Sequence, residues 1–394
     1  MIRITELRLP VNHAPEELEA AILKRLSISS KDLVAFTVFK RSHDARKNTA
    51  LSFIYTIDLS IKDEDKVLKK WGHDPHIRPS PDTSYHYVAK APQDIKKRPV
   101  VIGFGPCGIF AALILAQMGF KPIVLERGKQ VRERTQDTWG LWRKKILNPE
   151  SNVQFGEGGA GTFSDGKLYS QIKDPKFYGR KVIEEFIKAG APEEIAYVAK
   201  PHIGTFRLVG MVEKIRQEII DLGGEIRFQQ KVTSFDIQDG QLKALHLESG
   251  EVIEADHVVL ALGHSARDTF KALHQAGVYI EPKPFSVGFR IEHPQSLIDK
   301  ARLGPHAGNP LIGAADYKLV HHAKNGRAVY SFCMCPGGTV VAATSEENRV
   351  VTNGMSQYSR NERNANAGIV VNVDPSDYGA SSENPLAGID FQRA

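Results

Sequence analysis

The sequence predicts an α+β domain, then an α/β domain with a parallel sheet, then a β-rich part. Three observations predict this order. Residues 1–90 read as β-α-β-β-α-β, a strand–turn–helix–strand unit begins at residue 99, and residues 279–394 alternate short strands with Gly/Pro turns. A charged, proline-containing segment at 91–98 separates the first two parts. We therefore expect domains at 1–95, 96–278 and 279–394.

Composition limits the class of protein. Hydrophobic residues make up 41% of the 394 residues and charged residues 25%, a profile typical of a globular chain. No stretch approaches the roughly 20 apolar residues that a membrane-spanning helix needs, and residues 1–20 lack the apolar core of a signal peptide. The cysteines, Cys107, Cys333 and Cys335, are too few for a disulfide framework. We therefore expect a cytoplasmic protein with no membrane partner.

The elements of the first domain follow from periodicity. Alternation and β-branched or aromatic residues predict strands over 2–9, 33–40, 50–61 and 84–89. Apolar spacing of three and four predicts helices over 15–26 and 62–71. A polar turn at 42–49 joins the second and third strands. This order is that of a ferredoxin-like βαββαβ sandwich.

Positive charge gathers in this first domain. Residues 1–98 hold 18 Lys and Arg against 13 Asp and Glu, within a net charge of +6 for the whole chain. The excess is concentrated in two groups: Lys40, Arg41, Arg46 and Lys47, and then Lys96, Lys97 and Arg98. A basic surface can bind nucleic acid, and RNA-recognition modules share the element order. However, Phe53 and Tyr55 lie on the more apolar face of their strand, which predicts packing against the helices, so we do not expect a nucleic-acid partner.

A dinucleotide-binding turn is the strongest signal in the chain. An apolar strand runs into Gly103, and Gly105 and Gly108 complete a GxGxxG pattern at the start of a helix. Gly103 allows the tight turn, Gly105 lets the backbone approach a diphosphate, and Gly108 lets the helix pack on the strand. The helix start, at Pro106 and Cys107, presents free N–H groups and a partial positive charge to the diphosphate.

A carboxylate follows the next predicted strand, 122–125. Glu126 can accept hydrogen bonds from both ribose hydroxyls, and it would repel a 2′-phosphate. Glu126-Arg127-Gly128 resembles the end of this strand in the glutathione-reductase-like FAD superfamily. The run 255–263 resembles the superfamily's second signature, with Leu262 in place of the usual Thr, and 224–232 is similar to the strand that ends at the adenine. The resemblance implies a Rossmann-type FAD-binding domain, with Arg127, Val232, Ala261, Gly263 and His264 near the cofactor.

Further runs are similar to a family of uncharacterised bacterial FAD-dependent dehydrogenases. They are 155–168 (FGEGGAGTFSDGKL), 283–294 (KPFSVGFRIEHP), 335–338 (CPGG), 353–356 (NGMS) and 364–367 (NANA). The resemblance spans essentially the whole chain, including the ferredoxin-like domain, and implies FAD and redox activity but no particular substrate. Such folds close with a C-terminal strand and helix bearing a G-D or G-E-G-[AS]-G element. Because none precedes Ala394, we expect a truncated chain that holds flavin weakly.

The glycine-rich loop 156–167 is expected to lie along the cofactor. Gly161, with Thr162 and Ser164, can offer backbone N–H and hydroxyl groups to phosphate or ribityl oxygens. Lys167 can place positive charge near the flavin ring. The loop also matches GxGxxG, but no helix follows, so it predicts no second nucleotide fold. His73, His76, His321 and His322 have no companion ligands at metal spacing, and we expect no metal.

These patterns predict an FAD-dependent oxidoreductase that transfers hydride or electrons between an unidentified organic substrate and FAD. Residues 279–394 would form a mixed β substrate domain inserted in the FAD fold, and NAD(P)H would bind only transiently as electron donor. Two alternatives stay open: a flavin-binding regulatory protein that contacts RNA or a protein through the basic first domain, and an NAD-dependent dehydrogenase. No general acid or base can be chosen, even among alternating polar residues such as Arg290 and Glu292.

Overall fold

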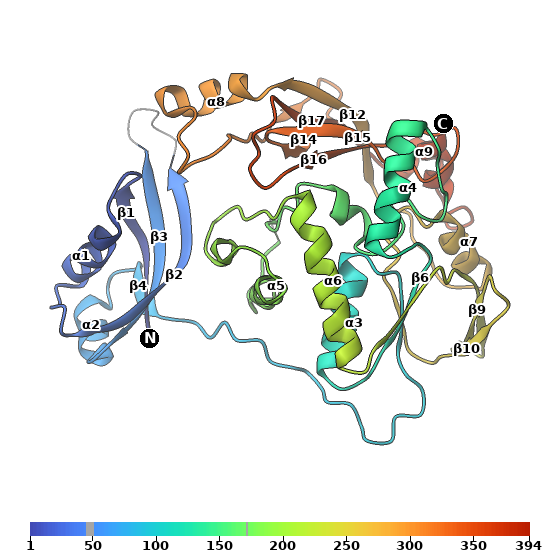
Figure 1. Ribbon diagram of the computed structural model, residues 1–394, viewed down its shortest axis with the longest axis horizontal. Coiled ribbons are helices and arrows are strands. Elements are labelled where there is room, and N and C mark those ends of the chain that lie inside the picture. The colour runs from blue at the N-terminus through green and yellow to red at the C-terminus, as the bar shows by residue number, and fades with distance from the viewer. Residues whose placement is uncertain (45–50, 171) are drawn as a thin grey trace. The chain divides into compact units, whose positions relative to one another are not determined.

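The computed structural model describes residues 1–44, 51–170 and 172–394, and they form two compact units of mixed α and β structure (Figure 1). The first unit comprises Met1–His86, Lys167–Ile203 and Pro294–Asp316. The second comprises Tyr87–Gly166, Gly204–His293 and Tyr317–Ala394. The division at 1–95, 96–278 and 279–394 stays a prediction.

The first unit begins with the predicted order β-α-β-β-α-β. Its elements are β1 (Ile2–Pro10), α1 (Pro15–Leu26), β2 (Leu33–Asp44), β3 (Ser52–Ile61), α2 (Glu64–Trp71) and β4 (Ile77–Pro79). The strands form an antiparallel sheet in the order β2-β3-β1-β4. Helix α2 begins where the Asp63 side chain accepts a hydrogen bond from the Lys66 N–H. The unit continues with α5 (Tyr178–Lys188), η2 (Glu193–Ala196), α8 (Gln295–Leu303) and η3 (Gly304–His306).

The core of this sheet lies between β3 and the helices. Residues of β3 alternate between buried and half-buried, and Phe53, Tyr55 and Ile57 are on the buried side. They pack in one cluster with apolar residues of α1, including Ile22 and Leu26. Helices α1 and α2 lie on one face of the sheet (Figure 1). The prediction that the aromatic face of β3 is core is therefore confirmed.

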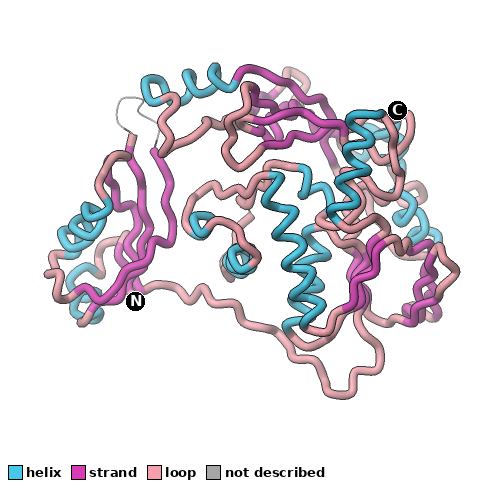
Figure 2. Tube along the Cα trace, viewed as in Figure 1, coloured by secondary structure: helices cyan, strands magenta, loops and turns pink. Residues whose placement is uncertain are grey.

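Two predicted boundaries in this region are wrong. No strand forms at 84–89: β4 lies earlier, and the chain from residue 80 to residue 99 is loop (Figure 2). Ile77 is buried and pairs with Ile4 of β1, whereas Val88 is 82% exposed, so the predicted strand lacks a buried apolar side chain at this position. Strand β2 also runs past residue 40, because Arg41–Asp44 pair with β3, so the turn starts later than 42. Arg46, Lys47 and the rest of 45–50 lie outside the described residues.

The second unit contains a parallel sheet that carries the glycine-rich turn. Its strands are β5 (Val100–Ile102), β6 (Ile123–Glu126), β7 (Glu225–Phe228) and β11 (Val258–Leu260), in the order β11-β5-β6-β7. Helix α3 (Pro106–Gln117) connects β5 to β6, and α6 (Thr205–Asp221) leads into β7 beside it (Figure 1). Parallel strands bring their carboxyl ends to one edge, where ligands bind in such sheets.

The predicted single strand 224–232 is wrong. Strand β7 ends at Phe228, Gln229 has a left-handed backbone with φ of 57°, and Val232 begins a strand of a different sheet. That sheet has the order β10-β9-β8 and consists of β8 (Val232–Gln238), β9 (Gln241–Leu247) and β10 (Val252–Glu254). The turn is fixed because the Gln229 and Gln230 N–H groups donate to the carbonyls of Gly128 and Glu126.

The second unit contains further helices and antiparallel strand pairings. The helices include α4 (Val131–Lys144), η1 (Gly159–Phe163), α7 (Arg267–Gln275), η4 (Pro375–Tyr378) and α9 (Ala387–Arg393). A third sheet has the order β12-β17-β14-β13, from β12 (Phe285–Pro294), β17 (Asn364–Val373), β14 (Ala328–Cys335) and β13 (Val320–His322). β15 (Gly338–Ala342) pairs with β16 (Thr352–Ser356). Within 1–44, 51–170 and 172–394, no helix has the length and apolar character of a membrane span.

Candidate functional site

The turn after β5 requires glycine at two of its three glycine positions. Gly103 has a φ of 99°, and a Cβ there would lie 2.4 Å from the Ala261 carbonyl oxygen. A Cβ on Gly108 would lie 1.8 Å from the Gly103 carbonyl oxygen, so α3 could not approach β5. At Gly105 the nearest atom to a Cβ is the Gly159 Cα at 3.6 Å, an ordinary contact. The protein itself therefore does not exclude a side chain at Gly105.

A cavity of about 320 Å³ lies against this turn. Most of the predicted cofactor residues line it: Gly103, Gly105, Pro106, Cys107, Glu126, Arg127, Gly161, Val232, Ala261, Gly263 and His264. Gly108 does not line the cavity, because it packs against Gly103 behind the turn. Helix α3 begins at Pro106, so its first N–H groups have no intrahelical partners and suit an anion. Segments from β5, β6, β8 and β11 thus meet around one cavity.

Glu126 is buried, and both its carboxylate oxygens accept backbone hydrogen bonds. Oε2 accepts from the Phe104 N–H at 2.7 Å, and Oε1 accepts from the N–H groups of Gly128 at 2.8 Å and Gly156 at 2.9 Å. A carboxylate offers about four acceptor positions, so roughly one is left for a ligand hydroxyl. The carboxylate therefore orders the turn and still lines the cavity.

Three predicted residues of the glycine-rich loop do not line this cavity. Thr162 is buried, and its hydroxyl lies 3.5 Å from the Glu157 carbonyl oxygen, to which it donates. The Ser164 hydroxyl donates to the Gly161 carbonyl at 2.7 Å. Lys167 belongs to the first unit, where its backbone bridges to His202. Their contact with the cofactor stays a prediction.

Arg134, which the sequence did not single out, organises the glycine-rich loop. It is fully buried and donates to the backbone carbonyls of Asn152, Val153, Glu157 and Gly159 at 2.6–2.8 Å. Burial lowers the pKa of its guanidinium to about 10. A Cβ on Gly156 would lie 2.3 Å from the Arg134 side chain, so this glycine makes room for it. Arg134 shares a buried helix face with Val131 and Thr138, and that spacing was the available signal.

Glu157 ties the same loop to α4 and α6. Its Oε2 accepts hydrogen bonds from the Val131 N–H and the Arg216 guanidinium, both at 2.8 Å. Its Oε1 is buried and has no hydrogen-bond partner among the described residues. Burial raises the pKa of this carboxyl above its usual range, although Val131 and Arg216 oppose the change.

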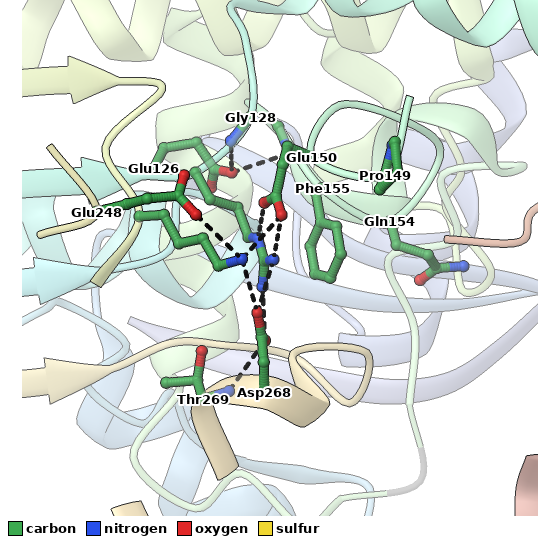
Figure 3. A network of polar contacts seen from close by, with 12 residues as sticks. Glu126, Gly128, Pro149, Glu150, Gln154, Phe155, Glu248, Asp268 and Thr269 are labelled. Atoms are coloured by element: carbon green, nitrogen blue, oxygen red, sulfur yellow. Dashed lines mark hydrogen bonds and ion pairs between the residues drawn. The ribbon is translucent and has the colours of Figure 1, made fainter. Parts of the chain in front are cut away.

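Five charged residues form a network of ion pairs, called the charge cluster below, and two of them line the cavity (Figure 3). They are Arg127, Glu150, Lys231, Glu248 and Asp268. Arg127 and Lys231 line the cavity and contact the same two carboxylates, Glu150 and Asp268. The Arg127 guanidinium also lies over the Phe155 ring, 4.1 Å from its centroid.

A second, polar cavity of about 320 Å³ adjoins the first, and Gln154, His264 and Ser265 line both. Arg267 and Arg349 line the second cavity. The Nε of Arg267 is buried and has no hydrogen-bond partner among the described residues, and its Nη1 lies 3.6 Å from the Glu346 carboxylate. That carboxylate is engaged by Arg393 at 2.5 and 3.0 Å. Arg267 Nη2 also donates to the Gln392 side chain at 3.3 Å, so the guanidinium lies at the cavity wall with part of its donors engaged.

His264 stands at the junction of the two cavities. Protein atoms crowd its imidazole, although part of its surface stays exposed, and this loss of solvent lowers the pKa of the ring below its usual range. The charge of Arg267 lowers that pKa further. His264 is consequently neutral near pH 7 and able to accept a proton.

The cysteines form no disulfide in the structure. Cys335 is buried in β14, and its thiol donates to the Cys333 carbonyl at 3.4 Å. The pairing of β14 with β17 shifts register between Phe332 and Cys335, which places Cys333 in a bulge. Among the residues that the structure describes, no three His, Cys, Asp or Glu side chains gather as metal ligands do.

Three family models match separate parts of the chain. Residues 284–394 match the C-terminal domain-like model of FAD-dependent proteins, and 179–283 match the flavin-containing amine oxidoreductase model. Residues 1–60 match a domain of unknown function. An uncharacterised protein of Clostridium beijerinckii is 46% identical over 393 residues, which is 100% of this chain and 73% of that protein.

Solved structures give weaker likenesses. An L-amino acid deaminase from Proteus vulgaris is 14% identical over 62% of this chain and 70% of its own, with a TM-score of 0.34. A 3-ketosteroid dehydrogenase from Rhodococcus jostii is 12% identical over 62% of this chain and 68% of its own, also with a TM-score of 0.34. At these TM-scores the similarity supports no conclusion about the fold or function of this chain.

The residues at the first cavity fit an FAD molecule. The free N–H groups of α3 suit the diphosphate, and the open side of Gly105 lets it approach the backbone. The remaining acceptor position of Glu126 suits a ribose hydroxyl. Val232, buried at the same cavity, offers an apolar contact for the adenine.

Proposed function

This chain belongs to a family of FAD-dependent oxidoreductases, and we propose that it acts as a dehydrogenase that takes electrons from a small organic substrate. We further propose that its cofactor domain is of the glutathione-reductase-like Rossmann type and that its N-terminal domain is ferredoxin-like. Bound FAD supplies a ring that accepts hydride or electrons, a chemistry that protein side chains lack. The observation that carries the proposal is the meeting of the glycine turn, Glu126 and Val232 at one cavity.

The chain's own residues hold the cofactor in this proposal. The start of α3 binds the diphosphate, Glu126 accepts a ribose hydroxyl, and Val232 contacts the adenine. Arg134 keeps the glycine-rich loop in place, so that the backbone around Gly161 borders the cofactor.

We propose that the second cavity receives the substrate. Three arginines line it, Arg267, Arg349 and Arg393, against one carboxylate side chain, Glu346. This excess of positive charge favours an organic anion such as a carboxylate, because a guanidinium binds an oxyanion through two parallel hydrogen bonds. Neutral His264 borders both cavities and is the candidate proton acceptor when the substrate loses its hydrogen. Small polar side chains such as Ser265 complete the lining.

An anaerobic reduction experiment tests this proposal. FAD-loaded protein is mixed with small carboxylates, with neutral alcohols and amines, and separately with NADH and NADPH, while flavin absorbance is followed. We expect bleaching by a carboxylate, and a lower rate in the Arg267→Gln variant without loss of FAD. In His264→Gln the rate should also fall, and the wild-type rate should decline as the pH drops below the usual range of histidine. If none of the organic substrates reduces the flavin, the proposal is contradicted. If only NADH or NADPH reduces it, the electron donor is a nicotinamide instead.

The alternative of an RNA- or protein-binding regulator has no specific observation in its favour. Arg41, from the basic segment, lies over the rings of Phe53 and Tyr197, at 4.8 and 5.2 Å from their centroids. Its guanidinium is thereby occupied within the first unit. We therefore propose a small molecule, rather than a nucleic acid, as the ligand of this protein.

A further inference from the structure

We infer that the charge cluster is a specificity determinant, which makes the cofactor cavity reject nucleotides that carry a phosphate on the adenosine ribose. The inference rests on the proposed cofactor site and assigns a role to residues beyond Glu126. It is based on the ion pairs that carboxylates form with the two cations that line the cavity, Arg127 and Lys231 (Figure 3).

Arg127 has most of its hydrogen-bonding capacity taken. Its side chain is 13% exposed, and Nε and Nη2 donate to the Glu150 carboxylate at 2.6 and 3.0 Å. Nη1 and Nη2 donate to the Asp268 carboxylate at 2.8 and 2.9 Å. The guanidinium face lies on Phe155. A ligand phosphate could bind Arg127 only by displacing one of the two carboxylates.

Lys231 is held by the same carboxylates. Its ammonium lies 2.9 Å from Glu150, 3.1 Å from Asp268 and 3.8 Å from Glu248. Among the described residues that line the cavity, Lys231 and Arg127 are the only lysine and arginine. Both cations that a phosphate would seek are therefore already paired.

The charge balance at this end of the cavity is negative. The cluster holds two cations and three carboxylates, and the buried carboxylate of Glu126 borders the same cavity. A phosphate monoester would bring about −1.5 to −2 further charges at pH 7. The adenosine ribose of FAD carries free hydroxyl groups and meets no such repulsion. The arrangement consequently favours an unphosphorylated ribose.

A purely structural role for the cluster makes a different prediction. The cluster joins the end of β6, the loop before Phe155, the start of β8 and the start of α7, so it could only hold these segments together. Loosening these segments would lower the binding affinity of every adenine nucleotide by a similar factor. A specificity role instead changes the ratio between nucleotides with and without a ribose phosphate.

The experiment compares 5′-AMP with adenosine 2′,5′-bisphosphate, which differ only by the phosphate on the ribose, by calorimetric titration of the protein without flavin. Wild type should bind 5′-AMP at least about tenfold more tightly, because the ribose phosphate of the bisphosphate finds no free cation. The isosteric variants Glu150→Gln and Asp268→Asn, combined, free Arg127 and Lys231. They should shift the ratio toward the bisphosphate by about tenfold or more, and adding Lys231→Met should reverse much of that shift.

Two further variants sharpen the test. Glu248→Gln removes only the carboxylate that lies farthest from Lys231, and it should shift the affinity ratio by about two- to threefold. This variant takes the place of the double variant if the double variant does not fold. Glu213→Gln breaks the exposed Arg132–Glu213 pair and should leave the ratio unchanged. An unchanged ratio in folded cluster variants, or equal loss of both probes, overturns the inference alone. If wild type binds neither 5′-AMP nor FAD, the proposed cofactor site is wrong and the inference fails with it.

Discussion

Replacing Arg134 by methionine tests the organisation of the glycine-rich loop. Methionine keeps much of the apolar stem but removes the guanidinium that donates to the carbonyls of Asn152, Val153, Glu157 and Gly159. These carbonyls belong to the loop that contains Gly156, where the absence of a side chain leaves room for the arginine.

The size of the effect follows from those four hydrogen bonds. A bond to a charged donor contributes about 1.5–3 kcal/mol, but the four are not additive. Removing a fully buried charge also removes its desolvation cost, which offsets part of the loss. Each buried carbonyl left without a donor costs about 1–3 kcal/mol, and with these offsets we expect a net loss of about 3 kcal/mol or more. FAD affinity should fall at least about tenfold, because the loop borders the cavity.

The assay is urea unfolding followed by tryptophan fluorescence, with flavin titration in parallel. Arg132→Met on the same helix is the matched control, since the Arg132 side chain is 73% exposed, and we expect it to unfold like wild type. A loss of less than about 1 kcal/mol in Arg134→Met, with unchanged FAD binding, would refute the reasoning.

Further predictions concern the turn, the ribose carboxylate and pH. Gly108→Ala places a Cβ 1.8 Å from the Gly103 carbonyl, so we expect FAD binding to fall by about a hundredfold or more in fluorescence titrations while circular dichroism stays near wild type. Glu126→Gln turns an amide N–H₂ toward N–H donors, and calorimetry should show FAD affinity reduced by about tenfold. Burial alone would raise the pKa of the Asp268 carboxyl, but Arg127 outweighs it and holds that pKa well below its usual range. Because the folded pKa is depressed, the stabilisation is present above about pH 4 and is lost as pH falls further, and urea midpoints of wild type should decline there more steeply than those of Asp268→Asn.

Local patterns in the sequence were enough to predict the features that depend on neighbouring residues. The alternation of Phe53, Tyr55 and Ile57 predicts which face of β3 is buried, because strand periodicity alone decides it. The spacing of Gly103 and Gly108 predicts the tight turn, because each has a backbone reason to lack a side chain.

Features set by distant contacts could not be predicted in this way. The spacing of Arg134 with Val131 and Thr138 places it on one helix face, but its role in ordering the loop depends on a segment that folds back over it. Asp268 joins the charge cluster from α7, far along the chain from Arg127. The break between β7 and β8 depends on one left-handed residue, Gln229, which the sequence of that segment does not mark.

The most direct test of the central claim is a fluorescence titration of the purified, flavin-free chain with FAD. The account predicts saturable binding of FAD, competition by 5′-ADP, and loss of both in Gly108→Ala. Absence of binding in the folded wild-type chain, or binding that Gly108→Ala leaves intact, would contradict it.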